Sequence, residues 1–225
     1  MLAYALPART LRPLLPLGLE LDTYEDRGFL AIALVQTENL RPKGFPRAFG
    51  RDFFLSGYRV FARFARPGRQ TLRGLRILRS DTDRRVMVAL GNLFTHYGYA
   101  LSTIDMRRDG DHMEINVTTP SRQADLHVVA DLSGVTAPPE GSPFRTLADA
   151  RRFAGPLPYT FDFDEPTGKM LVVRGLRSAW EPRPVHVETQ ASSFLERFDS
   201  PRLANAFFVE NVPYAWRPGV LEDLS

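Results

Sequence analysis

Short turns containing glycine separate the apolar segments of this chain, and they restrict how those segments can pair. Pro67–Gly68 follows the segment 53–64, Asp109–Gly110 separates YALSTIDMRR from HMEINVTT, and Glu165–Gly168 divides YTFDFDEPTGKMLVVRG. Asp-Gly is a strong hairpin signal, and turns this short cannot connect parallel strands. The sequence therefore predicts a mainly β, α+β fold in which antiparallel strand pairs dominate.

The apolar segments themselves have the residue patterns of strands. GFLAIALVQTENL (28–40) is apolar and bounded by turn residues, as expected for a buried strand. The segment 53–64 alternates, and TLRGLRILRS (71–80) is predicted to lie antiparallel beside it. One face of 53–64 is expected to carry Tyr58, Val60, Ala62 and Phe64, and the other face Arg59, Phe61 and Arg63. About eight strands are expected in all.

Three segments have helical features. The first begins after Ser80, its predicted N-cap, with Asp83 three residues on. It carries a core-facing stripe at three- and four-residue spacing and ends at Gly98, where a left-handed cap residue is favoured. This stripe consists of Val86, Leu90, Leu93 and Tyr97. The second, TLADARRFAG (146–155), starts with a threonine N-cap and stops at a glycine. The third, SSFLERFDSPRLANAFF (192–208), is expected to be helical and broken near Pro201.

The composition excludes several classes of protein. The 225 residues are 44% hydrophobic and 24% charged, which predicts one globular domain over residues 1–225. The chain has no cysteine, which excludes disulfides, thiol nucleophiles and cysteine-bound zinc and is compatible with the cytoplasm. No apolar run approaches the roughly 20 residues of a membrane helix. The arginines are dispersed, so we expect no nucleic-acid partner.

Motifs that carry chemistry are mostly absent. The sequence contains no G-x-S-x-G elbow, no phosphate-binding loop and no dinucleotide fingerprint, so no cofactor is predicted. The four histidines, at 96, 112, 127 and 186, lack the spacing of metal ligands, and no metal site is predicted. A Schiff-base lysine must be shielded from water. Lys43 lies in the loop segment RPKGFP and Lys169 at the exit of a hairpin turn, and both are expected to be solvated, which argues against that chemistry.

Three polar side chains remain as candidates for ligand binding, and the catalytic residues are unknown. Arg59 lies in the middle of an apolar strand, where its guanidinium could hold a carboxylate. His96 and Tyr97 end the first predicted helix and could transfer a proton. Each also has a structural explanation. Arg59 would be a solvated strand arginine, His96 a favourable residue at a helix C-terminus, and Tyr97 a core side chain.

The order of several blocks resembles a known family. FLSGYRVFARF, GLRILRSDTDR, GNLFTHYGY, YTFDFDEPTGKMLVVRG and VPYAWRPG resemble, over roughly residues 10–215, the YqjF-like proteins of domain of unknown function 2071. That family is similar to the acetoacetate-decarboxylase-like superfamily. The resemblance implies an antiparallel, closed or cone-shaped β-barrel with two or three flanking helices. It also implies a small-molecule ligand in the interior and a homo-oligomer.

The resemblance also limits the function. The decarboxylases use a lysine beside a second lysine on an interior strand, and this chain has no lysine pair. The family pattern N-x-R-x-Y-V retains only its arginine, at Arg59. We therefore expect a cytoplasmic protein that binds a small organic acid or carbonyl compound without a lysine imine. The alternatives are a lysine-independent lyase, hydratase or isomerase that uses His96 or Tyr97, and a non-catalytic interaction protein.

Overall fold

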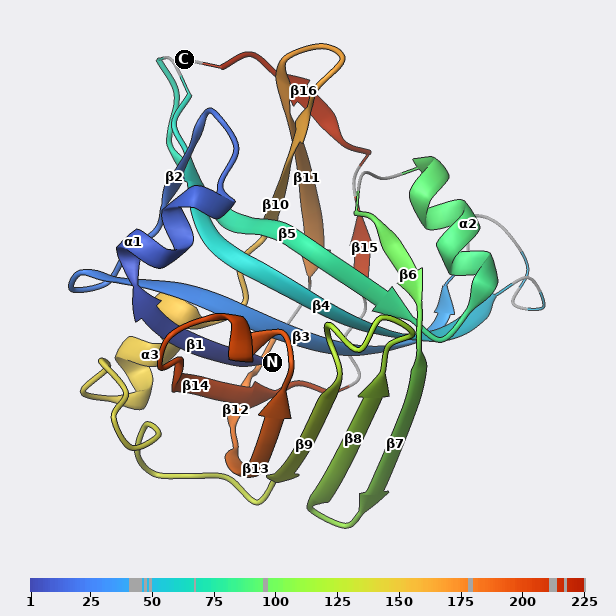
Figure 1. Ribbon diagram of the computed structural model, residues 1–225, viewed down its shortest axis with the longest axis vertical. Coiled ribbons are helices and arrows are strands. Elements are labelled where there is room, and N and C mark those ends of the chain that lie inside the picture. The colour runs from blue at the N-terminus through green and yellow to red at the C-terminus, as the bar shows by residue number, and fades with distance from the viewer. Residues whose placement is uncertain are drawn as a thin grey trace.

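The protein is mainly β, with two sheets and three short α-helices in the part that the structure describes. A computed structural model describes residues 1–40, 46, 48, 50–66, 68–94, 97–177, 180–210, 214–216 and 218–224. Figure 1 shows a large, bent sheet with a smaller four-stranded sheet packed below it. Strands β10 and β11 run steeply across the direction of β3, β4 and β5 in this view. Among the described residues neither sheet closes on itself, so the predicted closed barrel is not confirmed.

The large sheet is built around three long central strands. Its strand order is β12-β14-β1-β3-β4-β5-β10-β11-β15, and β2, β6 and β16 pair with β4, β5 and β11 respectively. The strands are β1 (Leu2–Pro7), β2 (Leu19–Leu21), β3 (Arg27–Leu40), β4 (Arg51–Phe64), β5 (Leu72–Thr82), β6 (Tyr99–Leu101), β10 (Tyr159–Asp164), β11 (Lys169–Arg177), β12 (Arg183–Pro184), β14 (Arg202–Phe208), β15 (Tyr214–Trp216) and β16 (Val220–Glu222). As predicted, β4 and β5 are antiparallel neighbours, and β10 and β11 form a hairpin.

The small sheet has the order β13-β9-β8-β7. Its strands are β7 (Thr103–Asp109), β8 (His112–Thr118), β9 (Leu126–Asp131) and β13 (His186–Ser192). The turn at Gly110, which has a φ of 59°, joins β7 to β8 as the Asp-Gly pair predicted. The inward residues of β8 and β9 alternate with exposed or half-buried ones, so this sheet has one apolar face.

Apolar side chains fill the space between the two sheets. The large sheet contributes Leu30, Ile32, Tyr58 and Val60 to this core, and the small sheet contributes Ile115, Val117, Leu126 and Val128. We call the side of the large sheet that meets this core the inner face. A second core lies on the opposite side, which we call the α3 face. It contains Phe29, Ala31, Phe61 and Leu75 from the sheet together with Phe144, Ala150 and Ala154.

The helices only partly follow the prediction. They are α1 (Ala8–Leu11), α2 (Arg85–Phe94) and α3 (Leu147–Ala154), with 3-10 turns at Arg12–Leu14 and Leu195–Arg197. Thr146 caps α3 as predicted, because its Oγ1 accepts from the Asp149 N–H at 3.1 Å. The N-cap predicted at Ser80 is wrong, since β5 continues to Thr82 and pairs there with β4 and β6. Val86 of the predicted core stripe is 43% exposed, whereas Gly98 is left-handed as predicted, with a φ of 60°.

The helix predicted over residues 192–208 is also wrong. Ser192 ends β13, a single 3-10 turn follows, and Arg202–Phe208 forms β14 between β1 and β12. Four consecutive residues of β14, at positions 204–207, are buried, since both faces of this strand are covered. Pairing with β1 on a sheet covered on both sides outweighs the helical propensity of this segment.

No helix within the described ranges is long and apolar enough to cross a membrane.

Candidate functional site

Strand β4 carries Arg59, which the sequence predicted as a ligand-binding candidate. The two faces of this strand differ in their polar contacts. Tyr58 lies opposite Ile32 of β3 on the inner face, and Arg59 lies opposite Ala31 on the α3 face. A one-residue bulge in β5 leaves Leu78 without a partner on β4, so that Tyr58 pairs with Arg79 while Arg59 pairs with Ile77. The alternation predicted for 53–64 is thus confirmed at Tyr58 and Arg59.

Arg59 lies on the α3 face with a buried donor that no described group satisfies. Its Nε is buried and has no hydrogen-bond partner among the described residues. The guanidinium folds back over Gly57, because a Cβ built on that glycine would lie 3.4 Å from Arg59 Nε and 3.5 Å from Nη2. Buried polar groups are nearly always hydrogen-bonded, so each exception requires an explanation. A bound anion would supply the missing acceptor at Arg59.

Two further polar groups reach the same face. Thr82 lies opposite Leu55, which is in phase with Gly57 and Arg59 on β4, and its buried Oγ1 also has no partner in the described part of the chain. The Tyr97 hydroxyl lies 2.7 Å from Thr160 Oγ1. Thr160 pairs with Leu75, and Leu75 pairs with Phe61, so Tyr97 ends on the α3 face as well. His96 lies outside the described residues.

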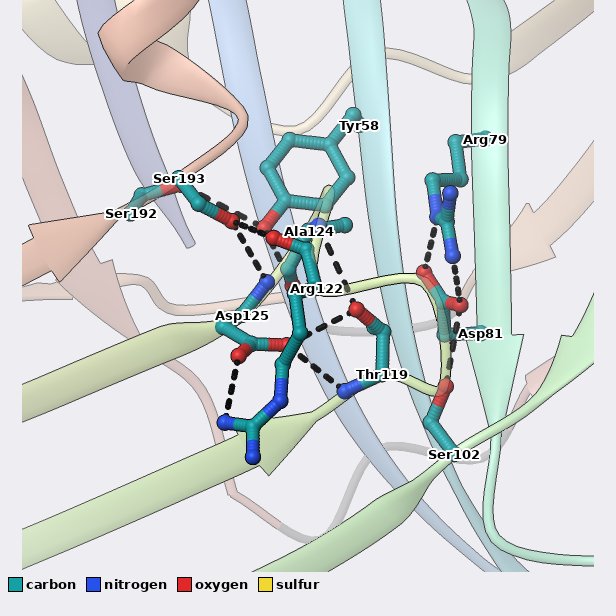
Figure 2. Close-up of polar contacts among 10 residues, drawn as sticks. All are labelled: Tyr58, Arg79, Asp81, Ser102, Thr119, Arg122, Ala124, Asp125, Ser192 and Ser193. Carbon is teal, nitrogen blue, oxygen red and sulfur yellow. Dashed lines mark hydrogen bonds and ion pairs between the residues drawn. The ribbon is translucent and has the colours of Figure 1, made fainter.

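The inner face and the adjoining loops hold two groups of polar side chains, each hydrogen-bonded within itself, and together we call them the inner-face network (Figure 2). Asp81 is fully buried and accepts a bidentate pair of hydrogen bonds from Arg79, Nε to Oδ2 at 2.7 Å and Nη2 to Oδ1 at 2.8 Å. The Ser102 hydroxyl donates to the same carboxylate at 3.0 Å. This carboxylate links β5 to the residue that leads into β7. The sequence did not predict these contacts, because SDTD (80–83) has the pattern of a helix cap.

Tyr58 belongs to the second group, which links the large sheet to the loops of the small one. Its hydroxyl donates to the Ala124 carbonyl at 3.2 Å and lies 3.4 Å from Ser192 Oγ. Its ring stacks on Phe194 at a centroid distance of 4.1 Å. Burial raises the pKa of Tyr58 to about 12, and the nearby Asp81 carboxylate acts in the same direction. Tyr58 therefore stays neutral at any physiological pH.

A second carboxylate, Asp125, fixes the turn between β8 and β9. Its Oδ1 accepts from the Thr119 backbone N–H at 2.7 Å and from the Thr119 hydroxyl at 2.8 Å, and Arg122 lies 3.3 Å from Oδ2. The backbone hydrogen bond from Thr119, aided by its hydroxyl and by Arg122, lowers the pKa of Asp125. We assign the inner-face network to the docking of the two sheets, because most of its polar groups have partners within the protein.

The alkaline stability of the protein tests this assignment. The unfolded chain releases the Tyr58 proton near pH 10, whereas the folded chain holds it to about 12. The free energy of unfolding should be independent of this group below pH 10 and fall by about 1.4 kcal/mol per pH unit between those values. Tyr58→Phe should reduce that slope, measured by urea unfolding at pH 8 to 11. Burial also raises the pKa of Tyr4, so part of the slope should remain. An unchanged slope would contradict the assignment.

Other candidate chemistry finds no support in the described ranges. No group of three histidine, aspartate or glutamate side chains there could hold a metal ion. Lys169 is the first residue of β11, pairs with Asp223 at 2.9 Å and is 40% exposed, as expected at the exit of a hairpin turn, and Lys43 lies outside the described residues. Two open recesses of about 410 Å³ each lie near Arg12 and Arg27, and neither includes Arg59, Tyr58 or Tyr97.

Comparison with known proteins places this chain in a family. Residues 1–213 match DUF2071, a family described as "Uncharacterized conserved protein". The chain belongs to this family. A comparison with the curated proteins found no match. Membership confirms the resemblance carried by the sequence blocks.

Solved structures similar to this DUF2071 protein have the acetoacetate-decarboxylase-like fold. Acetoacetate decarboxylase from Legionella pneumophila is 13% identical with a TM-score of 0.63, covering 98% of this chain and 82% of its own. The enduracididine biosynthesis enzyme MppR, complexed with pyruvate, is 14% identical with a TM-score of 0.64, covering 100% and 88%. An acetoacetate-decarboxylase-like enzyme from Sphingomonas wittichii is 12% identical with a TM-score of 0.55, covering 99% and 89%. At these identities the similarity shows the fold alone.

Proposed function

We propose that this DUF2071 protein binds a small organic acid or carbonyl compound on the α3 face of its large sheet, with Arg59 as the anchor. The observation that carries the proposal is the buried Arg59 Nε, which no described residue satisfies. A guanidinium presents a planar fork of donors that matches a carboxylate. The ligand would supply the missing acceptor to the guanidinium, which itself lies against Gly57.

The two faces of β4 support this choice of face. The inner face is filled by apolar side chains, and Arg79 there already donates two hydrogen bonds to Asp81, while Ser56 Oγ is buried there without a partner among the described residues. On the α3 face, Thr82 Oγ1 is a second buried group without a partner among the described residues. A ligand with both a carboxylate and a carbonyl oxygen would use two such donors. MppR, which has a similar fold, has been solved with pyruvate, so pyruvate is a suitable first probe.

Lysine imine chemistry is not part of the proposal. Lys169, at the start of β11, is exposed and paired with Asp223, and it is the only lysine among the described residues. If the site also catalyses a reaction, Tyr97 is the proton-transfer group that we assign to it. Its hydroxyl lies on the same face and is hydrogen-bonded to Thr160. The absence of cysteine fits a reducing compartment, and we place the protein in the cytoplasm.

Calorimetric titration with pyruvate and a panel of small carboxylic acids tests the proposal. Arg59→Gln should weaken binding about 10- to 150-fold, the effect of losing a charged hydrogen bond of about 1.5–3 kcal/mol. Arg73→Gln is the matched control, because Arg73 lies over Phe153 on the same face and its Nε already donates to Asp22 Oδ2 at 2.7 Å. This control should bind as tightly as the wild type. Equal affinity of the wild type and Arg59→Gln, or no binding across the panel, would contradict the proposal.

A further inference from the structure

Strand β7 forms an open edge of the small sheet. Within the described residues it pairs with β8 and with no other strand, and Figure 1 shows it at the outer side of that sheet. All of its residues except Ile104 are exposed, including Met106 at 40%. An edge strand leaves a row of backbone N–H and C=O groups unpaired, which is a template for a strand from another chain.

The charges of β7 are complementary to those of a second, antiparallel copy of the same strand. In a continuous antiparallel sheet with a two-fold axis perpendicular to it, facing residues point to the same side. This condition is met only when the two-fold axis passes through a residue, so that this residue lies opposite its own copy. With the axis at Met106, Asp105 of each copy lies opposite Arg107 of the other, which gives two such pairs. A centre at Asp105 or at Arg107 instead places that charge opposite itself. Among the registers that pair at least five residues of β7, the charge pattern therefore selects the one centred on Met106.

We propose that a second copy of this protein binds along β7 in that register, joining the two small sheets into one. Asp105 and Arg107 now form an exposed pair within one strand, with Nη2 and Oδ2 3.1 Å apart and side chains 53% and 76% exposed. In the dimer each would gain an opposite charge across the strands. The two Met106 side chains would cover each other.

The remaining charge on this strand fits the same register. Charged side chains on an edge often prevent pairing, because like charges meet. Arg108 is held within its own molecule by an ion pair with Glu210 and by the Phe208 ring, which lies 5.4 Å from its guanidinium carbon. It would lie opposite Ile104 of the second copy, so no like charges meet in this register.

Cross-linking tests the register, because the natural chain has no cysteine. Residues directly opposite have Cβ atoms roughly 4.5–5.5 Å apart, close to the separation that a disulfide bridges. Met106→Cys should form a covalent dimer on mild oxidation. Asp109→Cys is the control, since position 109 would face position 103 and two such cysteines would be far apart. Failure of Met106→Cys to cross-link, or equal cross-linking of both variants, would overturn the register.

Charge exchange tests the interface itself. By sedimentation equilibrium the wild type should be a dimer at roughly 0.1 mM. Asp105→Arg and Arg107→Asp should each weaken dimerisation by about tenfold or more, since each places like charges opposite. The double variant Asp105→Arg/Arg107→Asp should restore it, and circular dichroism should show all three variants folded. A monomeric wild type, or single variants that dimerise as tightly as the wild type, would overturn the proposal.

Discussion

Asp81→Ala is expected to lower the free energy of unfolding by about 3–5 kcal/mol, which is the usual loss when one partner of a buried ion pair is removed. Asp81 is fully buried and accepts three hydrogen bonds, two from Arg79 and one from Ser102. Its loss would leave the Arg79 guanidinium without a counter-charge beside the core. The Arg79 side chain is 21% exposed, so water partly compensates and the lower end of the range is expected.

Urea unfolding of Asp81→Ala should be compared with that of Asp223→Ala. Asp223 also pairs with a cation, Lys169 at 2.9 Å, but its side chain is 84% exposed. Exposed pairs contribute about 0–1 kcal/mol, so this control should unfold nearly as the wild type does. Similar losses in both variants would show that the inner-face network does not hold the sheets together.

Phe29→Ala is expected to cost about 3–5 kcal/mol, the usual range for deleting a buried phenylalanine ring. Phe29 is fully buried at the centre of the α3 face. Its ring centroid lies 5.1 Å from that of Phe153, 5.4 Å from that of Phe144 and 6.0 Å from that of Phe61. The ring thus connects the large sheet to α3 and to the loop before it.

Thermal and urea unfolding measure this effect, with Leu17→Ala as the control. Leu17 is a large apolar residue that is 76% exposed, so its truncation should change the free energy of unfolding by less than about 0.5 kcal/mol. A Phe29→Ala loss as small as that of Leu17→Ala would mean that α3 and its loop detach from the sheet at little cost. The position of the α3 face behind Arg59 would then be in doubt.

Local patterns predicted much of this fold, because they act through contacts close in sequence. Alternation in 53–64 assigned Tyr58 and Arg59 to opposite faces, Thr146 capped its helix, and Asp109–Gly110 made its hairpin. The prediction for the segment 192–208 was wrong because its conformation depends on a contact distant in sequence. Its state depends on β1, which lies at the other end of the chain. No local pattern carries that pairing.

The residues of the candidate site could also be predicted only in part from the sequence. Arg59 stood out in the sequence as a charge within an apolar strand, and its register on β4 supports the face that we propose for the ligand. Thr82 could not be found from the sequence, because its burial follows from the extension of β5 past Ser80. The pairing of Asp81 with Arg79 and Ser102 depends on the β5 bulge and on the course of the chain after β6. His96 stays a prediction from the sequence.

A crystal structure of the protein soaked with pyruvate tests the central claim most directly. We expect the carboxylate of the ligand within about 3 Å of the Arg59 guanidinium, on the α3 face. Density for pyruvate between the two sheets beside Arg79, with nothing at Arg59, would contradict it.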